Sequence, residues 1–514
     1  MSRRNATTIQ APPDSAASPG QSLTSLAMKG TGWVLAGKLS SRLLAFLSVI
    51  ILARLLSPDQ FGVFGFVTLA ICSLDTVSQI GFDAALIHQR DGSDGMFDTA
   101  WTVQAARGVV LAVLLSAAAP LVARFFREPR IVPMLRVLSL SLVLQGLSNI
   151  GMVSLRKNLA FGRIFVYDVA AEAAGLAGAV ALALIWSGAW ALVGGRMISS
   201  AVRCGLSFVL HPYRPGIRFN AAEARALFRY GRWMMSSIFL IFVVTHGDSM
   251  AVGKLLGAAA LGVYQVVYRL SNLAATNVSD AVSSVAFPAY ARLQDDPGRL
   301  RSAYFRVMSI TMSLAAPAAL GTAAIAPIFV RVVLGDKWEA AIVPTQILCF
   351  YGLAHSLGGT TAPIFFATGQ PRVLTIAALL DLIGMAALIW PGTRLWGLEG
   401  LCVAVTIPMV LSQIYTLMKV SRTLRTRLRT VLAHAAQPLL AAAAMYLMLT
   451  GLVSVFPTTM AALVALISTG AAAYALMMLL TAGAGKRREW GILGRNLLGI
   501  FGAAGGQIAE GGRT

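Results

Sequence analysis

Long apolar stretches alternate with short polar breaks along most of the chain. Each apolar stretch covers about 20 to 28 residues, enough for a helix to cross the roughly 30 Å hydrocarbon core of a bilayer. A soluble fold would need many wholly buried long helices to account for the same pattern. The sequence therefore predicts an all-α, polytopic membrane protein with about 14 transmembrane helices, at residues 30–55, 61–88, 98–123, 131–155, 164–187, 189–210, 228–256, 260–290, 303–330, 339–367, 373–391, 396–418, 434–455 and 460–482.

The charges in the polar breaks predict the topology. Membrane proteins concentrate Lys and Arg in cytoplasmic loops, so every second break should be basic if the N-terminus is inside. The alternate breaks are basic, although one of the others holds Arg124, Arg127 and Arg130. We expect a bacterial inner-membrane protein with both termini in the cytoplasm. The residues that carry this assignment are Arg156, Lys157, Arg163, Arg214, Arg218, Arg225, Arg292, Arg299, Arg301, Lys419, Arg422, Arg425, Arg427 and Arg429.

The composition agrees with a membrane protein and argues against a nucleic-acid-binding protein and a metalloprotein. The chain is 57% hydrophobic and 12% charged, against about 25% charged residues in soluble domains. The net charge of +21 is explained by topology, so a nucleic-acid partner is not expected. Cysteines occur only inside apolar stretches and without zinc-ligand spacing, so neither a metal nor another cofactor is expected. They are Cys72, Cys204, Cys349 and Cys402.

An internal repeat appears at an offset of 200 residues. Trp33 aligns with Trp233, Arg54-Leu55-Leu56 with Lys254-Leu255-Leu256, and Phe61-Gly62-Val63-Phe64 with Leu261-Gly262-Val263-Tyr264. The first span thus matches the seventh, which comes six spans later, and this predicts two six-helix lobes related by a pseudo-two-fold axis, plus two C-terminal helices. The predicted parts are a disordered cytoplasmic tail (1–28), an N-lobe (29–210), a cytoplasmic linker (211–227), a C-lobe (228–420), two further helices (421–483) and a cytoplasmic tail (484–514).

Basic side chains inside the spans are candidates for binding an anion. A charge at the bilayer centre costs at least about 2.5–3.5 kcal/mol, so it should face a cavity or a partner. Guanidinium groups bind phosphate through paired donors. Lys38 and Arg42 share one helix face, as do Arg196 and Arg203. Snorkelling to the interface is the alternative for some of them, including Arg203. The candidate cations are Lys38, Arg42, Arg196, Arg229, Arg232 and Arg269.

Acidic side chains form a second set with two interpretations. Neighbouring carboxylates on one face raise each other's pKa, so one could carry a coupling proton or act in gating. Alternatively, each acid pairs with an arginine on a neighbouring helix. The pattern does not choose between proton coupling, sodium coupling and no coupling. The residues are Asp75, Asp83, Asp168, Glu172, Asp248 and Asp280.

Several stretches resemble a known family. The first half carries ARLLSPDQFG at 53–62 and IHQRD at 87–91, and the second carries RYGRWMMSS at 229–237, GKLLGAAALGVY at 253–264 and FPAYARLQDD at 287–296. Over residues 28 to 430 the chain resembles the polysaccharide exporters of the multidrug/oligosaccharidyl-lipid/polysaccharide superfamily. It is most similar to the exopolysaccharide or colanic-acid-type exporters, which are known as lipopolysaccharide biosynthesis proteins.

The resemblance implies two lobes around a central cavity lined by spans 1, 2, 7 and 8. It implies a flippase that moves undecaprenyl-pyrophosphate-linked oligosaccharides for exopolysaccharide or lipopolysaccharide synthesis by alternating access. A polysaccharide polymerase and glycosyltransferases would be its partners, together with the bilayer. A lipid II flippase and a drug/cation antiporter are alternatives in the same superfamily, although a basic interior disfavours cationic drugs. A membrane glycosyltransferase or polymerase would need acids or histidines in an extramembrane domain, so an enzyme is not expected.

Overall fold

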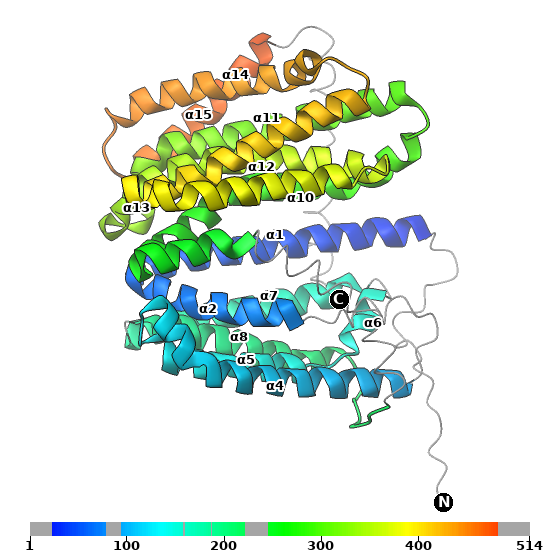
Figure 1. Cartoon of the computed structure of the whole chain (residues 1–514), viewed down its shortest axis with the longest axis vertical. Helices are drawn as coiled ribbons and strands as arrows, with labels where there is room; N and C mark the ends of the chain where they lie inside the picture. Colours follow the sequence, from blue (N-terminus) through cyan, green and yellow to red (C-terminus); the bar gives the residue numbers. More distant parts are fainter. Residues whose placement is uncertain (1–22, 79–93, 158–159, 187, 221–244, 482–514) are drawn as a thin grey trace, which may run out of the picture. The chain divides into compact units, whose positions relative to one another are not determined.

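The computed structural model describes residues 23–78, 94–157, 160–186, 188–220 and 245–481, and most of these residues are helical (Figure 1). Seven of the described helices are long and apolar enough to cross a bilayer. Their lengths match the hydrocarbon thickness because each residue of a helix rises by about 1.5 Å. The predicted all-α polytopic membrane fold is confirmed.

The chain forms two compact units, Met1–Val263 (unit 1) and Tyr264–Thr514 (unit 2). The helical segment 245–256 and the first residues of the following helix belong to unit 1, whereas the sequence assigns them to the C-lobe. The predicted lobe and linker boundaries stay predictions, and the C-terminal tail lies outside the described residues.

Unit 1 is built from helices that pack in neighbouring pairs, chiefly α7 with α8, α4 with α5, and α1 with α7. Its first helix begins at Leu23, inside the predicted tail, because Leu23 and Leu26 extend the apolar pattern toward the N-terminus. The helices are α1 (Leu23–Leu55), α2 (Pro58–Ser78), α4 (Asp94–Phe126), α5 (Ile131–Leu147), α6 (Met152–Lys157), α7 (Phe161–Ile185) and α8 (Ala189–Leu210).

The fourth predicted span, residues 131–155, is not one helix. α5 ends at Leu147, Ser148 has an extended backbone, and the short α6 begins at Met152. The side chain of Asn149 stabilises the break, because its Oδ1 accepts the Gly151 N–H at 2.9 Å. Asparagine favours such local side-chain to backbone bonds over a continuing helix.

Unit 2 has a closely packed interior between α10 and α14. Tyr290, Tyr304, Met308, Phe365 and Val420 are all wholly buried there. The helices are α10 (Ala258–Leu293, which begins in unit 1), α11 (Pro297–Phe329), α12 (Ile342–Ala367), α13 (Arg372–Thr423), α14 (Leu428–Val453) and α15 (Met460–Thr481), with a π-helical turn (Val330–Leu334) and a 3-10 turn (Asp336–Ala341) between α11 and α12.

α13 consists of two helices that meet at a kink. Trp396 and Gly397 leave the helical conformation, and Gly397 has a φ of 55°, a value that favours glycine. The backbones on the two sides come close, since a Cβ on Gly400 would lie 2.0 Å from the carbonyl oxygen of Gly392. The two separate spans predicted at 373–391 and 396–418 agree with this kink, which lies a few residues later than expected.

Candidate functional site

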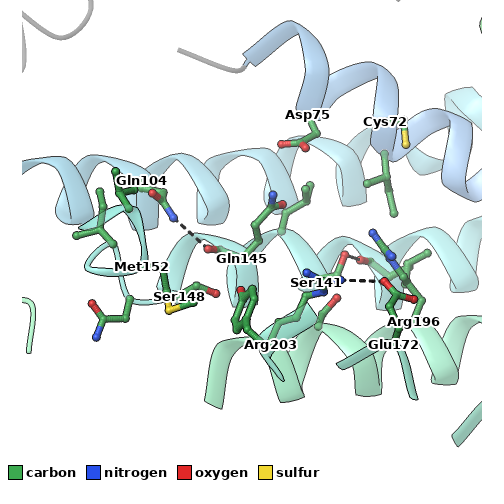
Figure 2. A pocket seen from close by; sticks show the side chains of 18 of the residues that line it. Cys72, Asp75, Gln104, Ser141, Gln145, Ser148, Met152, Glu172, Arg196 and Arg203 are labelled. Carbon is green, nitrogen blue, oxygen red and sulfur yellow. Dashed lines mark hydrogen bonds and ion pairs between the residues drawn. The ribbon is translucent and has the colours of Figure 1, made fainter. Parts of the chain in front are cut away.

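Unit 1 encloses a cavity of about 550 Å³ between α2, α4, α5, α7 and α8 (Figure 2). Polar and charged side chains supply much of its lining, which is unusual for helices inside a bilayer. We call it the unit 1 cavity. Its polar lining consists of Thr68, Cys72, Asp75, Gln104, Ser141, Gln145, Ser148, Asn149, Tyr167, Glu172, Arg196, Ser200 and Arg203.

α5 contributes a polar stripe to this wall. Ser141, Gln145 and the C-cap residue Ser148 are spaced by four and three residues, so they follow one face of α5 to its end. The Ser141 hydroxyl donates to the Leu138 carbonyl at 2.7 Å, and the Ser148 hydroxyl donates to its own helix in the same way. Each hydroxyl oxygen keeps lone pairs that can accept from a ligand.

An ion-pair cluster joins α7 to α8 at the cavity. The guanidinium of Arg203 donates to Asp168 Oδ1 at 2.8 Å and to Glu172 Oε1 at 2.9 Å. The same guanidinium lies 5.5 Å from the centre of the Tyr167 ring. The two acids predicted as a pair therefore do share a site, and one arginine neutralises one of their two charges.

Arg196 is the cation of this cavity that is left for a ligand. It lies seven residues before Arg203, on the same face of α8, and lines the cavity beside Glu172 (Figure 2). Within the described part of the chain, its guanidinium makes no ion pair and no side-chain hydrogen bond. Arg196 is exposed, so its guanidinium is open to a ligand, and the paired donors of a guanidinium suit phosphate and carboxylate groups.

Asp75 also lines the cavity, but its charge is compensated. Arg107 on α4 donates to Asp75 Oδ1 at 2.5 Å and to the Asp75 carbonyl at 3.0 Å. The same guanidinium reaches the Ser78 hydroxyl at 2.8 Å. This set of bonds fixes the end of α2 against α4. Asp75 is therefore paired with an arginine of a neighbouring helix, the second of the two interpretations of the acids.

The chain that leaves α8 lies against one end of the unit 1 cavity. Tyr213 donates its phenolic O–H to Asp98, which also accepts the Gly216 N–H at 2.8 Å. Asn149 donates to the Tyr213 carbonyl at 2.7 Å. His211 is buried and hydrogen-bonded to Ser154 at 2.7 Å. Burial lowers the pKa of His211, and the positive charges of Arg163 and Arg214 lower it further.

The other predicted site residues do not line this cavity. Arg42 is half-buried on α1, Arg269 is exposed on α10, and Asp248 is buried in the helical segment 245–256. Asp83, Arg229 and Arg232 lie outside the described residues, and so do the side chains of Lys38 and Asp280. Their assignment as binding, coupling or gating residues stays a prediction.

Sequence reasoning missed the uncharged half of the site. Gln104, Ser141, Gln145 and Asn149 line the cavity but are not among the predicted site residues, all of which are charged. The signal was present as helical spacing: Ser141, Gln145 and Ser148 on α5 match Arg196, Ser200 and Arg203 on α8, each set covering two turns of one face. Two parallel polar stripes on otherwise apolar helices indicate a shared polar space.

Residues 51–343 match a family of proteins described as polysaccharide biosynthesis proteins. The chain belongs to this family. The lipopolysaccharide biosynthesis protein WzxC of Escherichia coli is 27% identical over 329 residues, 64% of this chain and 67% of that protein. The succinoglycan biosynthesis transport protein ExoT of Rhizobium meliloti is 25% identical over 461 residues, 88% and 92% of the two chains.

Solved structures support the same fold. The lipid II flippase MurJ in an inward closed conformation aligns with a TM-score of 0.67 at 15% identity, over 86% of this chain and 97% of that one. An inward-facing multidrug transporter of the MATE family aligns with a TM-score of 0.57 at 16% identity, over 75% and 96%. The resemblance to polysaccharide exporters is thus confirmed. The chain is a multi-pass membrane protein of the polysaccharide biosynthesis family, and these relatives and solved structures include a transport protein, a flippase and a transporter.

Proposed function

We propose that this protein translocates undecaprenyl-pyrophosphate-linked oligosaccharide units across the bacterial inner membrane by alternating access. The units would serve exopolysaccharide or lipopolysaccharide synthesis. Glycosyltransferases would supply them on the cytoplasmic side, and a polysaccharide polymerase would use them on the other. The observation that carries the proposal is the unit 1 cavity, in which Arg196, which makes no ion pair with any of the described residues, faces a polar wall.

The charges of the cavity suit a pyrophosphate. The charges of Arg107 and Asp75 neutralise each other, and Arg203 is ion-paired to two carboxylates. Both arginines are therefore already bound to acids. Arg196 remains, and its planar fork can donate two parallel N–H bonds to a phosphate. A cationic drug would find Asp168 and Glu172 already bound to Arg203.

The uncharged lining suits the sugars. Amide and hydroxyl groups can each donate and accept, which is what sugar hydroxyls require. A volume of about 550 Å³ falls within the range of about 300–1,000 Å³ typical of small-molecule sites. The cavity is therefore large enough for part of the head group, while the polyprenyl tail would stay in the lipid.

The test is deletion of the gene in its host, with measurement of exported polysaccharide and of the leaflet that holds the lipid-linked intermediate. We expect export to stop and the intermediate to collect on the cytoplasmic side. Complementation with Arg196→Gln should leave export low, because a charged hydrogen bond worth about 1.5–3 kcal/mol is lost. Arg196→Lys should restore part of it. Arg124→Gln removes an exposed arginine of α4 outside the cavity and should export normally.

Three outcomes would contradict the proposal: two concern its cargo and one its site. Unchanged export after deletion, in a host without a second exporter, would remove polysaccharide as the cargo. Loss of viability with accumulation of lipid II on the cytoplasmic side would instead assign lipid II as the cargo. Normal export by Arg196→Gln would remove the unit 1 cavity from the transport route while leaving the cargo assignment intact.

A further inference from the structure

The chain that leaves α8 runs along the beginning of α4 in one direction. We call residues 211–219 the strap. The Gly216 N–H donates to Asp98 Oδ1 at 2.8 Å, and the Arg218 N–H donates to the Thr102 hydroxyl at 3.1 Å. Asp98 and Thr102 lie one turn apart on α4, about 6 Å along its axis, which is close to the full reach of two extended residues. The strap is therefore nearly extended here, and it advances along α4 toward the middle of that helix.

Further bonds hold the start of the strap against unit 1. Tyr213 donates its phenolic O–H to Asp98, and the Asn149 amide donates to the Tyr213 carbonyl at 2.7 Å. The buried His211 is hydrogen-bonded to Ser154 at 2.7 Å. These bonds fix the strap to the surface of unit 1, so its outward side chains lie at a defined level along α4.

That level is the surface of the bilayer. The exposed large apolar side chains of α4 begin at Val109 and continue to Phe125, which marks the part of the helix that faces lipid. Thr102 precedes Val109 by seven residues, about 10 Å along the helix axis. Lipid head groups occupy roughly 5–8 Å on each side of the hydrocarbon core. The bond between Arg218 and Thr102 therefore lies at the outer part of the head-group layer.

Two apolar side chains and one arginine of the strap are exposed at this level. Ile217 is 89% exposed and Phe219 is 65% exposed. They are two residues apart in a nearly extended backbone, so they share one side of the strap. Arg218 is attached to α4 by its backbone, and its exposed guanidinium makes no ion pair with any of the described residues. Apolar side chains next to a free cation are typical of segments that lie in a membrane interface.

We propose that the strap binds anionic lipid: Ile217 and Phe219 enter the surface of the bilayer, and the Arg218 guanidinium binds lipid phosphates. A lipid fits better than a soluble protein because these side chains lie at head-group level beside a membrane-spanning helix. The predicted topology puts this end of α4 at the cytoplasmic leaflet, whose anionic lipids attract arginine. The inference goes beyond transport and does not depend on the cargo.

The test measures how fast a cysteine in the strap reacts in membranes of different charge. The full chain carries Ile217→Cys in a background without natural cysteines (Cys72→Ala, Cys204→Ala, Cys349→Ala and Cys402→Ala). It is reconstituted into nanodiscs of phosphatidylcholine, with or without phosphatidylglycerol, and treated with an uncharged polyethylene-glycol maleimide. We expect labelling to be about fivefold slower in the anionic nanodiscs, the factor that one arginine near an anionic surface contributes. Phe219→Cys, as a second reporter, should show the same slowing.

Arg218→Gln separates the charge from the fold of the strap. It removes the guanidinium and keeps the backbone bond to Thr102, so labelling of Ile217→Cys should become equal in the two lipids. Arg422→Gln is the matched control, because it removes an exposed arginine from the last turn of α13 and should leave the fivefold difference unchanged. Gln294→Cys, at an exposed position between α10 and α11, should react equally in both lipids and excludes an effect on the reagent itself.

Two results would overturn the proposal. Equal labelling of Ile217→Cys and Phe219→Cys in both lipids would mean that the strap does not bind anionic head groups, whether the common rate is fast or slow. A difference that persists in Arg218→Gln would mean that this arginine does not supply the attraction. The nanodiscs contain no lipid-linked sugar, so neither result bears on the polysaccharide assignment.

Discussion

Between α5, α7 and α8 of unit 1 lies a cavity faced by serine, glutamine and arginine, whereas between α10, α11 and α12 of unit 2 the space is filled by Tyr304, Met308 and Phe365. Both units consist mainly of long helices. The difference therefore comes from the side chains on the inward faces. A helix pair of this kind can hold either a solvated binding space or a close-packed core, according to a few positions on each helix.

The largest effect should come from truncating the packed interior of unit 2. Met308 is wholly buried in that core, so Met308→Ala should lower the free energy of unfolding by about 2–5 kcal/mol through lost contacts and a new cavity. Thermal unfolding of the purified protein in detergent measures it. Met308→Leu keeps the volume and should cost less than about 1.5 kcal/mol. Equal stability of Met308→Ala and the parent would show that this interior is not close-packed.

A smaller loss should follow when the ion-pair cluster of unit 1 is broken. Arg203→Leu leaves Asp168 and Glu172 facing each other without a cation, and we expect a loss of about 1–3 kcal/mol, reduced because these side chains are about a third exposed. Adding Glu172→Gln should restore part of the stability by removing the repulsion. A double variant no more stable than Arg203→Leu alone would argue against this electrostatic account.

The polar end of unit 1 should also make stability depend on pH. The folded pKa of His211 lies below its ordinary value of 6.5, so the unfolded chain binds more protons in that window. Stability should therefore fall as the pH drops through 6.5 toward the folded pKa, by at most about 1.4 kcal/mol per pH unit. Unfolding temperatures measured across this range should show the slope for the parent and for Met308→Leu, and lose it in His211→Asn.

The smallest effect tests whether the units differ only inside. Gly205 in α8 and Gly451 in α14 are both exposed, and a Cβ at either would meet nothing within 4 Å. Gly205→Ala and Gly451→Ala should each raise the free energy of unfolding by about 0.4–1 kcal/mol, because alanine loses less backbone entropy on folding. Clearly different values in the two units would mean that their outer surfaces differ as well.

Hydropathy was sufficient to predict the helices, because a span must satisfy its backbone internally and be apolar over its whole length. The predicted ends of α10 and α15 lie within three residues of the observed ones. The break after Leu147 was missed because Ile150 and Val153 keep the hydropathy high across it. It depends instead on Asn149, whose bond to the Tyr213 carbonyl joins residues 64 apart in sequence.

The site was predictable only in part for a related reason. The spacing of Asp168 and Glu172 placed both acids on one face, and the structure brings them to one arginine. Which arginine it would be could not be read from spacing, because α7 and α8 pair through tertiary packing. The match between Arg107 and Asp75, 32 residues apart on different helices, is another such case. Local periodicity gives the face of a residue, whereas its partner depends on which helices pack together.

Gly62 and Gly262 occupy equivalent positions in the internal repeat, and each lies against the backbone of the other's turn. A Cβ on Gly62 would lie 1.7 Å from the Ala258 carbonyl oxygen, and one on Gly262 would lie 1.9 Å from the Pro58 carbonyl oxygen. This contact makes the sequences of the two turns depend on each other. A substitution in either turn changes the surface against which the other turn must fit, so neither turn can accumulate bulky residues by itself. Most of the repeat is free to diverge, as the difference between Pro58 and Ala258 illustrates, since both meet the facing glycine through backbone atoms. The two glycines are therefore expected to change only together among descendants of this gene. They should persist after most of the sequence similarity between the two halves is lost.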